Sequence, residues 1–192
     1  MGGYFGNAAV FLIQTAFGLY ILAVLLRFLL QWVRADFYNP VSQFLVKMTT
    51  PLLRPLRRAI PGFGGIDFAS VVLMLALQLI ELVLVTQLLG QPLSVGGLMV
   101  LAVAELLSLL IKVFLFSILI QVILSWVRPG DHSPVSLLLY QLNEPLLAPA
   151  RRIIPTISGL DLSPILVLVL LQLSLMLLVA PLRDFGMLLN LR

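Results

Sequence analysis

The chain has 192 residues, of which 61% are hydrophobic and 10% are charged, with a net charge of +4 at pH 7 and a mean hydropathy of +1.13. Soluble domains are about 25% charged, so this composition excludes an ordinary soluble protein and predicts segments dissolved in lipid. There is no cysteine and His132 is the one histidine, which excludes disulfides, thiolate sites and bis-histidine sites, so we expect no cofactor and no metal.

Four apolar runs are long enough to cross a hydrocarbon core, which takes roughly 20 helical residues. They occupy about residues 8–33, 68–89, 98–127 and 162–181. The first run is longer than the core of a signal peptide, which has about 7–15 residues, so we expect it to be retained as a span. The sequence therefore predicts an all-α membrane protein with four transmembrane helices.

Basic residues gather in the first and third connections between these runs, whereas the middle connection, residues 90–97, carries no charge. The positive-inside rule makes both basic connections cytoplasmic. Because the number of spans is even, both termini are then predicted outside the cytoplasm, although Arg183 and Arg192 near the C-terminus argue mildly against this orientation. The basic residues concerned are Arg34, Lys47, Arg54, Arg57 and Arg58, then Arg128, Arg151 and Arg152.

A repeat appears when the sequence is compared with itself at an offset of 94 residues. Matching residues include Trp32 and Trp126, Pro40 and Pro134, Arg57-Arg58 and Arg151-Arg152, and Asp67 and Asp161. We expect two tandem units, residues 1–93 and 94–192, each with two spans and a basic cytoplasmic segment. Since each unit has two spans, the copies are predicted to be parallel, related by an axis along the membrane normal.

The segment 51–61 is a predicted amphipathic helix, with Arg54, Arg57 and Arg58 on the face opposite its leucines. It is too short to span a bilayer but suits the headgroup region, and another short helix is expected before it, over residues 39–47. Two interpretations stay open: a docking surface for anionic lipid or a partner protein, or a plain topology signal. The basic residues are not interleaved with exposed aromatics, so nucleic acid is not expected. The candidate docking residues are Arg54, Arg57, Arg58, Arg151 and Arg152.

Asp67 and Asp161 each stand directly before an apolar run, where an aspartate can cap the first backbone N–H groups of a helix. An ion pair to the same carboxylate from Arg58 or Arg152 would also fold the surface helix back against the span. We therefore expect both aspartates to act as helix caps or ion-pair partners.

Four ionisable residues fall inside the predicted spans, where charge is costly and usually faces the bundle interior. Glu81 and Glu105 are expected at similar depths towards the outer side, with Lys112 two turns deeper on the Glu105 face. The three are expected to form an ion or proton waypoint or a charge-neutralising clamp. Arg27 lies about two turns from the cytoplasmic end and is expected to snorkel towards it. None of the four is reproduced in the other repeat.

The doubled pattern of Trp-Val-Arg, Asn-Pro or Ser-Pro, Pro-Leu-Leu, Arg-Arg, Ile-Pro and Gly-Ile-Asp or Gly-Leu-Asp resembles the YggT family of bacterial membrane proteins, over nearly the whole chain. The second copy departs from the first at Ala148, Ala150 and Glu144. The resemblance implies a multi-pass protein of the bacterial inner membrane, associated with osmotic tolerance, potassium homeostasis or cell division, and in chloroplast relatives with cytochrome assembly or nucleoid distribution.

Two functions follow as hypotheses. The first is a non-enzymatic scaffold or assembly factor in envelope or osmotic homeostasis, acting through the basic surface. The second is a component of a potassium or proton channel or transporter that works as an oligomer, because four apolar spans leave little room for a water-filled path. The expected partners are a bilayer with anionic headgroups and, left open, a second copy of the chain or another membrane protein. An enzyme has the least support, because His132 has no repeat counterpart.

Overall fold

The computed structural model describes residues 3–92, 94–127, 130, 133–154 and 161–190. Helices account for nearly all of this part of the chain, and one isolated bridge joins Phe63 to Ile66. The predicted all-α class is confirmed for the described residues. The elements are α1 Tyr4–Trp32, α2 Pro40–Ala59, α3 Phe68–Leu89, α4 Val95–Val127, α5 Pro134–Ile153, α6 Ser163–Ser174, the π-helical turn η1 Leu175–Val179 and α7 Ala180–Asn190.

Within the described residues, four helices are long and apolar enough to cross a membrane: Tyr4–Trp32, Phe68–Leu89, Val95–Val127 and Ser163–Asn190. In the most apolar window of each, only 11% to 28% of the residues are buried inside the protein. The rest of the apolar surface is left for lipid, which agrees with the composition.

The fourth span extends beyond its predicted end at residue 181, because Arg183 and Asp184 end the apolar run without ending the helix. Pro181 lacks the N–H that would continue the helical ladder. The π turn lies immediately before it, and there the Ala180 N–H bonds the Leu175 carbonyl. Such a local widening accommodates a proline inside a membrane helix, so α6, η1 and α7 form one continuous span.

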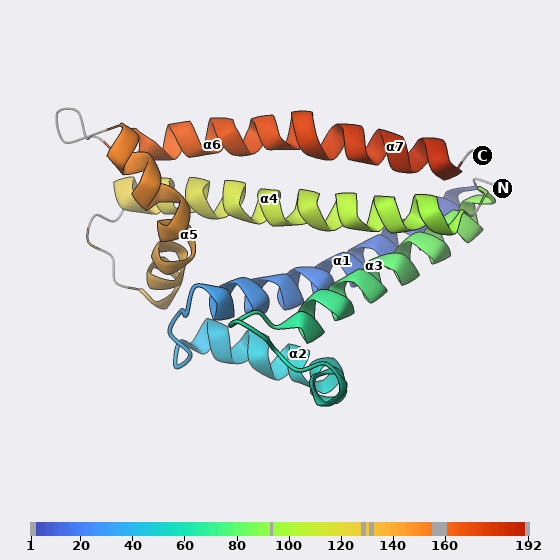
Figure 1. Ribbon diagram of the computed structural model, residues 1–192, viewed down its shortest axis with the longest axis horizontal. Helices are drawn as coiled ribbons and strands as arrows, with labels where there is room; N and C mark the ends of the chain where they lie inside the picture. The colour runs from blue at the N-terminus through green and yellow to red at the C-terminus, as the bar shows by residue number, and fades with distance from the viewer. Residues whose placement is uncertain (1–2, 93, 128–129, 131–132, 155–160, 191–192) are drawn as a thin grey trace.

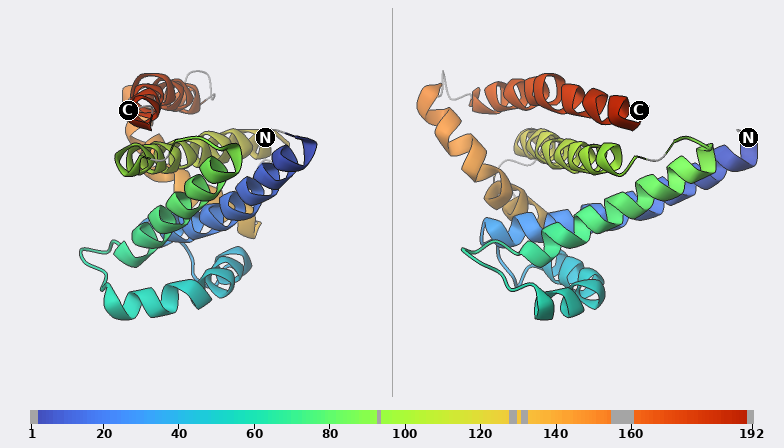
Figure 2. Two further views of the ribbon diagram at one scale, coloured as in Figure 1. Left: turned by 90° about the vertical axis from the view of Figure 1, so that its right-hand side faces the viewer. Right: turned by 45° about the vertical axis from the view of Figure 1, so that its right-hand side comes forward.

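The spans form two pairs (Figure 1). α4 runs alongside α6 and α7, and α1 runs alongside α3, with α3 and α4 also in contact. The N- and C-termini lie together at one end of the molecule, and α2 and α5 lie towards the other (Figures 1 and 2). Both connecting helices of the basic segments are therefore found at the same end of the bundle.

α2 and α5 differ from the sequence prediction, because each is one helix of 20 residues rather than two short helices. Asn39 caps α2 by accepting the Val41 N–H at 2.9 Å, and Ser133 caps α5 by accepting the Ser136 N–H at 3.3 Å. Each helix contains two prolines, Pro51 and Pro55 in α2 and Pro145 and Pro149 in α5. The prolines interrupt the hydrogen-bond ladder and bend the helix, and α2 changes direction along its length (Figure 2).

The main core cluster lies where α1, α3 and α4 meet α2 and α5, the two helices expected at the membrane interface and called the interfacial helices below. Ile21 and Val24 of α1 are fully buried there, together with Leu53 of α2. A second cluster joins Ile118 of α4 to Leu147 of α5. Leu53 and Leu147 occupy matching positions in the two repeats, so each interfacial helix inserts an equivalent leucine into the bundle.

Candidate functional site

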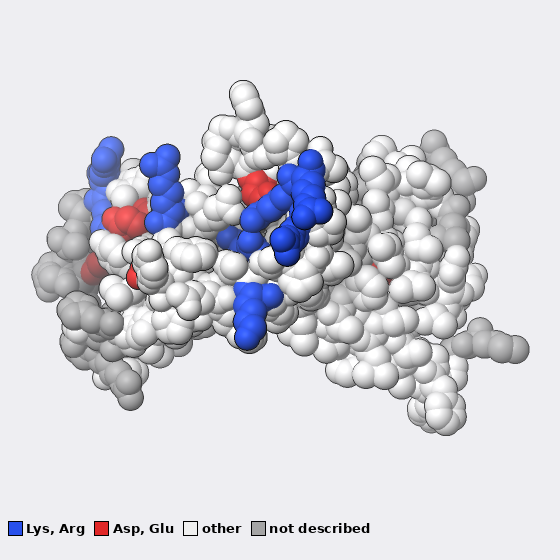
Figure 3. Space-filling model, turned by 90° about the horizontal axis from the view of Figure 1, so that it is seen from below, with Lys and Arg blue, Asp and Glu red and all other residues white. Residues whose placement is uncertain are grey.

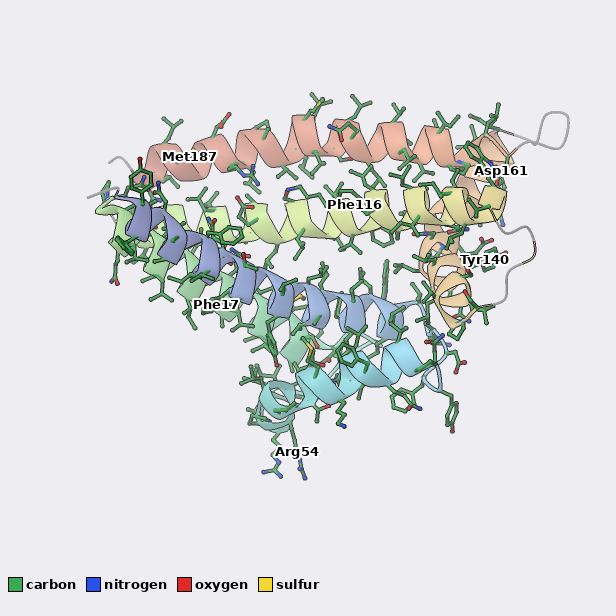
Figure 4. The ribbon with its side chains drawn as sticks, turned by 180° about the vertical axis from the view of Figure 1, so that it is seen from behind. Phe17, Arg54, Phe116, Tyr140, Asp161 and Met187 are labelled. Atoms are coloured by element: carbon green, nitrogen blue, oxygen red, sulfur yellow. The ribbon has the colours of Figure 1, made fainter. Side chains whose placement is uncertain are left out.

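The basic surface lies over α2 and α5. Lys and Arg side chains gather over these two helices, with carboxylates beside them (Figure 3). On α2, the apolar face is turned inward, with Leu45 and Leu53 buried, and Arg54 and Arg58 are exposed. Arg54 points away from the bundle (Figure 4). Arg128 and Arg192, also named among the basic residues, lie outside the described part of the chain.

Arg57 ties the end of α2 to the start of α3. Its guanidinium forms an ion pair with Asp67, in which Nη2 and Nε both donate to Oδ2, the latter at 3.2 Å. The expected partner was Arg58, and that expectation was wrong. Arg57 follows the buried Leu53 by four residues and so lies on the same face of α2, whereas Arg58 is rotated away from that face by one residue. Arg57 also donates to Gln31 Oε1 of α1 at 3.3 Å.

Asp67 is 5% exposed and stands at the N-cap of α3, without a side-chain capping bond. Its Oδ2 accepts the Ser70 hydroxyl at 2.6 Å. Burial raises the pKa of the carboxyl, but the hydrogen bonds from Arg57 and Ser70 and the Arg57 charge outweigh burial, so the pKa of Asp67 lies below its ordinary value. The carboxylate is therefore charged and holds α2 against α3 at neutral pH.

Arg151 makes the corresponding link in the second repeat, where Arg152 was the expected partner. Arg151 Nε donates to Asp161 Oδ2 at 3.1 Å, and Nη1 contacts Glu144 Oε2 at 2.9 Å. Asp161 also accepts the Ser163 backbone N–H at 2.9 Å at the start of α6. Burial raises the pKa of Asp161, and the bonds from Ser163 and Arg151 outweigh it and lower that pKa. Arg152 remains exposed.

Arg27 is buried rather than snorkelling, and it docks α1 onto α2. Its Nη1 donates to Thr49 Oγ1 at 2.7 Å, to Thr50 Oγ1 at 3.2 Å and to the Val46 carbonyl at 3.3 Å. The expectation that Arg27 reaches for the interface was wrong because α2 supplies these acceptors within the protein. Thr49 was not predicted from the sequence, because Thr49 and Thr50 lie between the two predicted short helices and belong to no motif.

The second repeat makes the same link with neutral groups. Asn143 stands at the position of Thr49, and its Nδ2 donates to Gln121 Oε1 at 2.8 Å. Gln121 in turn stands at the position of Arg27. Asn143 is fully buried and also accepts the Ser117 hydroxyl at 2.6 Å. Each repeat thus joins its first span to its interfacial helix through one buried polar pair, charged in one copy and neutral in the other.

Hydrogen bonds also connect the two interfacial regions. Asn39 Nδ2 donates to the Pro134 carbonyl at 2.7 Å, and the Asp36 backbone N–H donates to Gln141 Oε1 at 3.2 Å. These residues are far apart in the sequence, so the contacts join the two units at the end that carries the basic surface.

Glu81, Glu105 and Lys112 line one cavity of about 270 Å³ between α1, α3 and α4, together with Gln14 and Gln78. Glu81 Oε2 accepts the Gln78 amide at 3.2 Å. Arg27 is not part of this group and lines a different cavity.

A clamp between Glu105 and Lys112 is not formed. Glu105 Oε2 instead pairs with Arg183 Nη2 of α7 at 2.9 Å. Lys112 makes no ion pair within the described part of the chain. Sequence reasoning had treated Arg183 only as a charge near the terminus, because the extension of the fourth span into α7 was not foreseen. Within the described part of the chain, no three side chains of His, Cys, Asp or Glu are arranged to hold a metal ion.

Four apolar helices and two basic helices at one end of the bundle define a multi-pass membrane protein. The family model described as CCB3/YggT matches residues 6–88 and again residues 100–182. The chain therefore belongs to the CCB3/YggT family, and the two matched ranges are offset by the same interval as the sequence repeat.

Relatives support the same assignment. The chain is 52% identical over 171 residues to the uncharacterized protein PA0392 of Pseudomonas aeruginosa, and the aligned region covers 87% of this chain and 86% of the relative. It is 40% identical over 168 residues to the uncharacterized protein YggT of Escherichia coli K12, covering 86% of each chain. No solved structure matches the chain. These printed names give the family and no activity.

Proposed function

We propose that this protein is a non-enzymatic scaffold or assembly factor of the bacterial inner membrane, acting in envelope or osmotic homeostasis. It docks anionic lipid headgroups or a partner protein through the basic surface of α2 and α5. The proposal rests on a difference among the arginines of α2 and α5, some of which are paired with carboxylates and some of which are not. Arg57 and Arg151 are held in ion pairs, whereas Arg54, Arg58 and Arg152 are exposed and make no ion pair with a described carboxylate.

The surface is prepared for docking, because the helices that carry it are fixed. Leu53 and Leu147 anchor α2 and α5, the ion pairs to Asp67 and Asp161 tie their C-terminal ends to the following spans, and Asn39 joins the two regions. Free cations on a rigid helix lose little conformational freedom when a partner binds. Orientation by the positive-inside rule places this surface in the cytoplasm.

The test uses a double variant, Arg54→Gln with Arg58→Gln, and a charge-preserving control, Arg54→Lys with Arg58→Lys. A photoreactive amino acid that replaces Lys47 is used for crosslinking in intact cells. If the surface docks a partner protein, we expect one defined protein adduct; if it docks lipid, we expect lipid adducts and no protein adduct. The glutamine variant is expected to lose the adduct and the osmotic complementation, and the lysine variant to retain both. Equal complementation by all three proteins would overturn the proposal.

A second candidate function, a component of an ion pathway, rests on the cavity lined by Glu81, Glu105 and Lys112. Conduction of potassium or protons would require an oligomer that extends this cavity across the membrane. Glu81→Gln is the appropriate variant, because Glu105 also holds Arg183. Flux of potassium or protons into liposomes that contain the wild type, and its loss in Glu81→Gln with the same thermal unfolding, would support the pathway. Absence of flux in the wild type removes it.

A further inference from the structure

We propose that the cavity between the end of α1 and the start of α2 is a binding site for a phosphate group, supplied in the membrane by the headgroup of an anionic lipid. The cavity has a volume of about 420 Å³ and is lined by α1, the connection after it, and α2. It is separate from the outward-facing basic surface, because neither Arg54 nor Arg58 lines it.

Three guanidinium groups line this cavity, those of Arg27, Arg34 and Arg57. Arg27 uses only Nη1 in its bonds to α2, and no described residue accepts a hydrogen bond from its Nε or Nη2. The Arg34 side chain likewise has no described acceptor. A guanidinium can donate two parallel hydrogen bonds to two oxygens of one phosphate. The unused N–H donors of Arg27 and Arg34 therefore suit the binding of an oxyanion.

A neutral donor lies beside them. Ser42 lines the same cavity in the first turn of α2, is 6% exposed, and its buried Oγ has no hydrogen-bond partner among the described residues. A buried hydroxyl without a partner costs free energy, and a turn of the Ser42 side chain towards the cavity that it lines would let a bound phosphate oxygen accept its hydrogen bond.

The charge balance favours an anion. No carboxylate lines the cavity. Asp67 balances Arg57, and the nearby Asp36 side chain accepts the Tyr38 N–H at 2.9 Å and is not part of the lining. Two of the three positive charges, those of Arg27 and Arg34, therefore have no counterion among the described residues.

The backbone is shaped to bring Arg34 to this place. Arg34 has a φ of 55°, in the left-handed region that non-glycine residues seldom adopt. This conformation ends α1 in the way common at helix C-termini, since the Ala35 N–H bonds the Leu30 carbonyl at 2.8 Å. The bend turns the chain from α1 into the connection that closes the cavity.

Depth in the membrane identifies the source of the phosphate. Trp32 is the last residue of α1, and tryptophan at the end of a span marks the headgroup level. Arg27 lies five residues earlier, about 7 Å deeper. A lipid headgroup therefore reaches this cavity from the leaflet, with its acyl chains directed along the apolar surface of α1.

The second repeat lacks the buried arginine of this site, because Gln121 takes the place of Arg27. Arg151, which matches Arg57, pairs with two carboxylates, Glu144 and Asp161, rather than one. We therefore place the phosphate site in the first repeat.

Native mass spectrometry of the full-length protein in mild detergent tests the inference, with phosphatidylglycerol, phosphatidylcholine and inorganic phosphate as separate probes. The wild type is expected to retain one phosphatidylglycerol in preference to phosphatidylcholine. Arg34→Gln and Ser42→Ala, neither of which removes a contact that holds α2, are each expected to weaken this binding, Arg34→Gln by about tenfold. Gln43→Ala is the matched control, because Gln43 is the exposed neighbour of Ser42 and does not line the cavity, and it is expected to bind as the wild type does.

Two results would overturn the inference. One is retention of phosphatidylglycerol by Arg34→Gln and Ser42→Ala at the wild-type level. The other is occupation by inorganic phosphate that phosphatidylglycerol does not displace, which would keep the phosphate chemistry but reject the lipid source. The outcome is independent of docking at the outer surface, because the variants that test docking, at Arg54 and Arg58, leave this cavity intact.

Discussion

Asp67 and Asp161 occupy matching positions but carry different energetic weight. The Asp67 side chain is 6% exposed and that of Asp161 is 35% exposed. A charged hydrogen bond contributes more when it is shielded from water. Asp67→Asn is expected to lower the free energy of unfolding by about 2 kcal/mol, and Asp161→Asn by less, as measured by denaturant titration in detergent micelles. An equal loss for both variants would contradict the role assigned to burial.

Acid should weaken the same ion pair. The pKa of Asp67 in the folded protein lies below its ordinary value, because the bonds from Arg57 and Ser70 outweigh the effect of burial. Its contribution to stability is therefore fully present above the ordinary carboxyl pKa of about 3.9 and is lost as the pH falls through the lower, folded value. Unfolding measured between about pH 5 and pH 2 should show this loss in the wild type and a smaller one in Asp67→Asn.

Thr49 shows what the sequence could not disclose at the scale of single residues. Arg27 was recognised as a costly intramembrane charge, but its acceptor was not, because threonine is common in helices and its register depends on how α2 docks. Thr49→Val is expected to destabilise the protein by about 1–3 kcal/mol, since it leaves a buried guanidinium with fewer acceptors. Thr15→Val is the control, because the Thr15 hydroxyl is exposed and bonds only the Phe11 carbonyl of its own helix. Thermal unfolding of the two variants side by side makes the measurement.

At the scale of elements, the spans were predictable because lipid imposes a length and a composition on them. Their ends were not. Charged residues ended the predicted fourth span, whereas the π turn before Pro181 and the pairing of Arg183 with Glu105 let the helix continue to Asn190. In α2 the prolines had the opposite effect on the prediction, because Pro51 was expected to begin a second short helix and instead lies inside one continuous helix. In both places tertiary contacts decided the boundary.

The close packing of α4 on α7 depends on a glycine that hydropathy does not reveal. A Cβ atom added to Gly186 would lie 2.8 Å from Leu101 Cγ and 3.2 Å from the Leu101 backbone nitrogen. Small residues let membrane helices approach in this way. Gly186→Val is expected to separate the helices and lower the free energy of unfolding by about 1–3 kcal/mol.

Gly18 of α1 provides the matched control for Gly186, because nothing lies within 4 Å of an added Cβ there. Gly18→Ala should leave stability unchanged or raise it slightly, through better helix propensity. Denaturant titration in micelles compares the two. A similar response from both glycines would show that helix propensity, rather than contact between α4 and α7, determines the result.

For the whole molecule, the repeat was visible in the sequence because prolines, arginines and aspartates in register do not arise from hydropathy. Its contacts recur in space: Arg57 with Asp67, and Arg151 with Asp161. α1 and α4 both start at the end that holds the termini and finish near α2 and α5 (Figure 1), which supports parallel units. Differences such as Arg27 against Gln121 lie at equivalent buried positions, and the hydrogen-bond partners of these residues required coordinates.

The orientation of the molecule in the membrane stays a prediction of the positive-inside rule, and the lack of cysteine in the chain makes it directly testable. Both ends of the bundle offer exposed positions, Arg58 on α2 and Gln91 in the turn between α3 and α4. A membrane-impermeant maleimide applied to intact cells is expected to label Gln91→Cys and to spare Arg58→Cys until the inner membrane is opened. Because α2 and α5 lie at the same end, Arg152→Cys should behave as Arg58→Cys does. Labelling of Arg58→Cys from outside would place the basic surface away from the cytoplasm and remove the docking function with it.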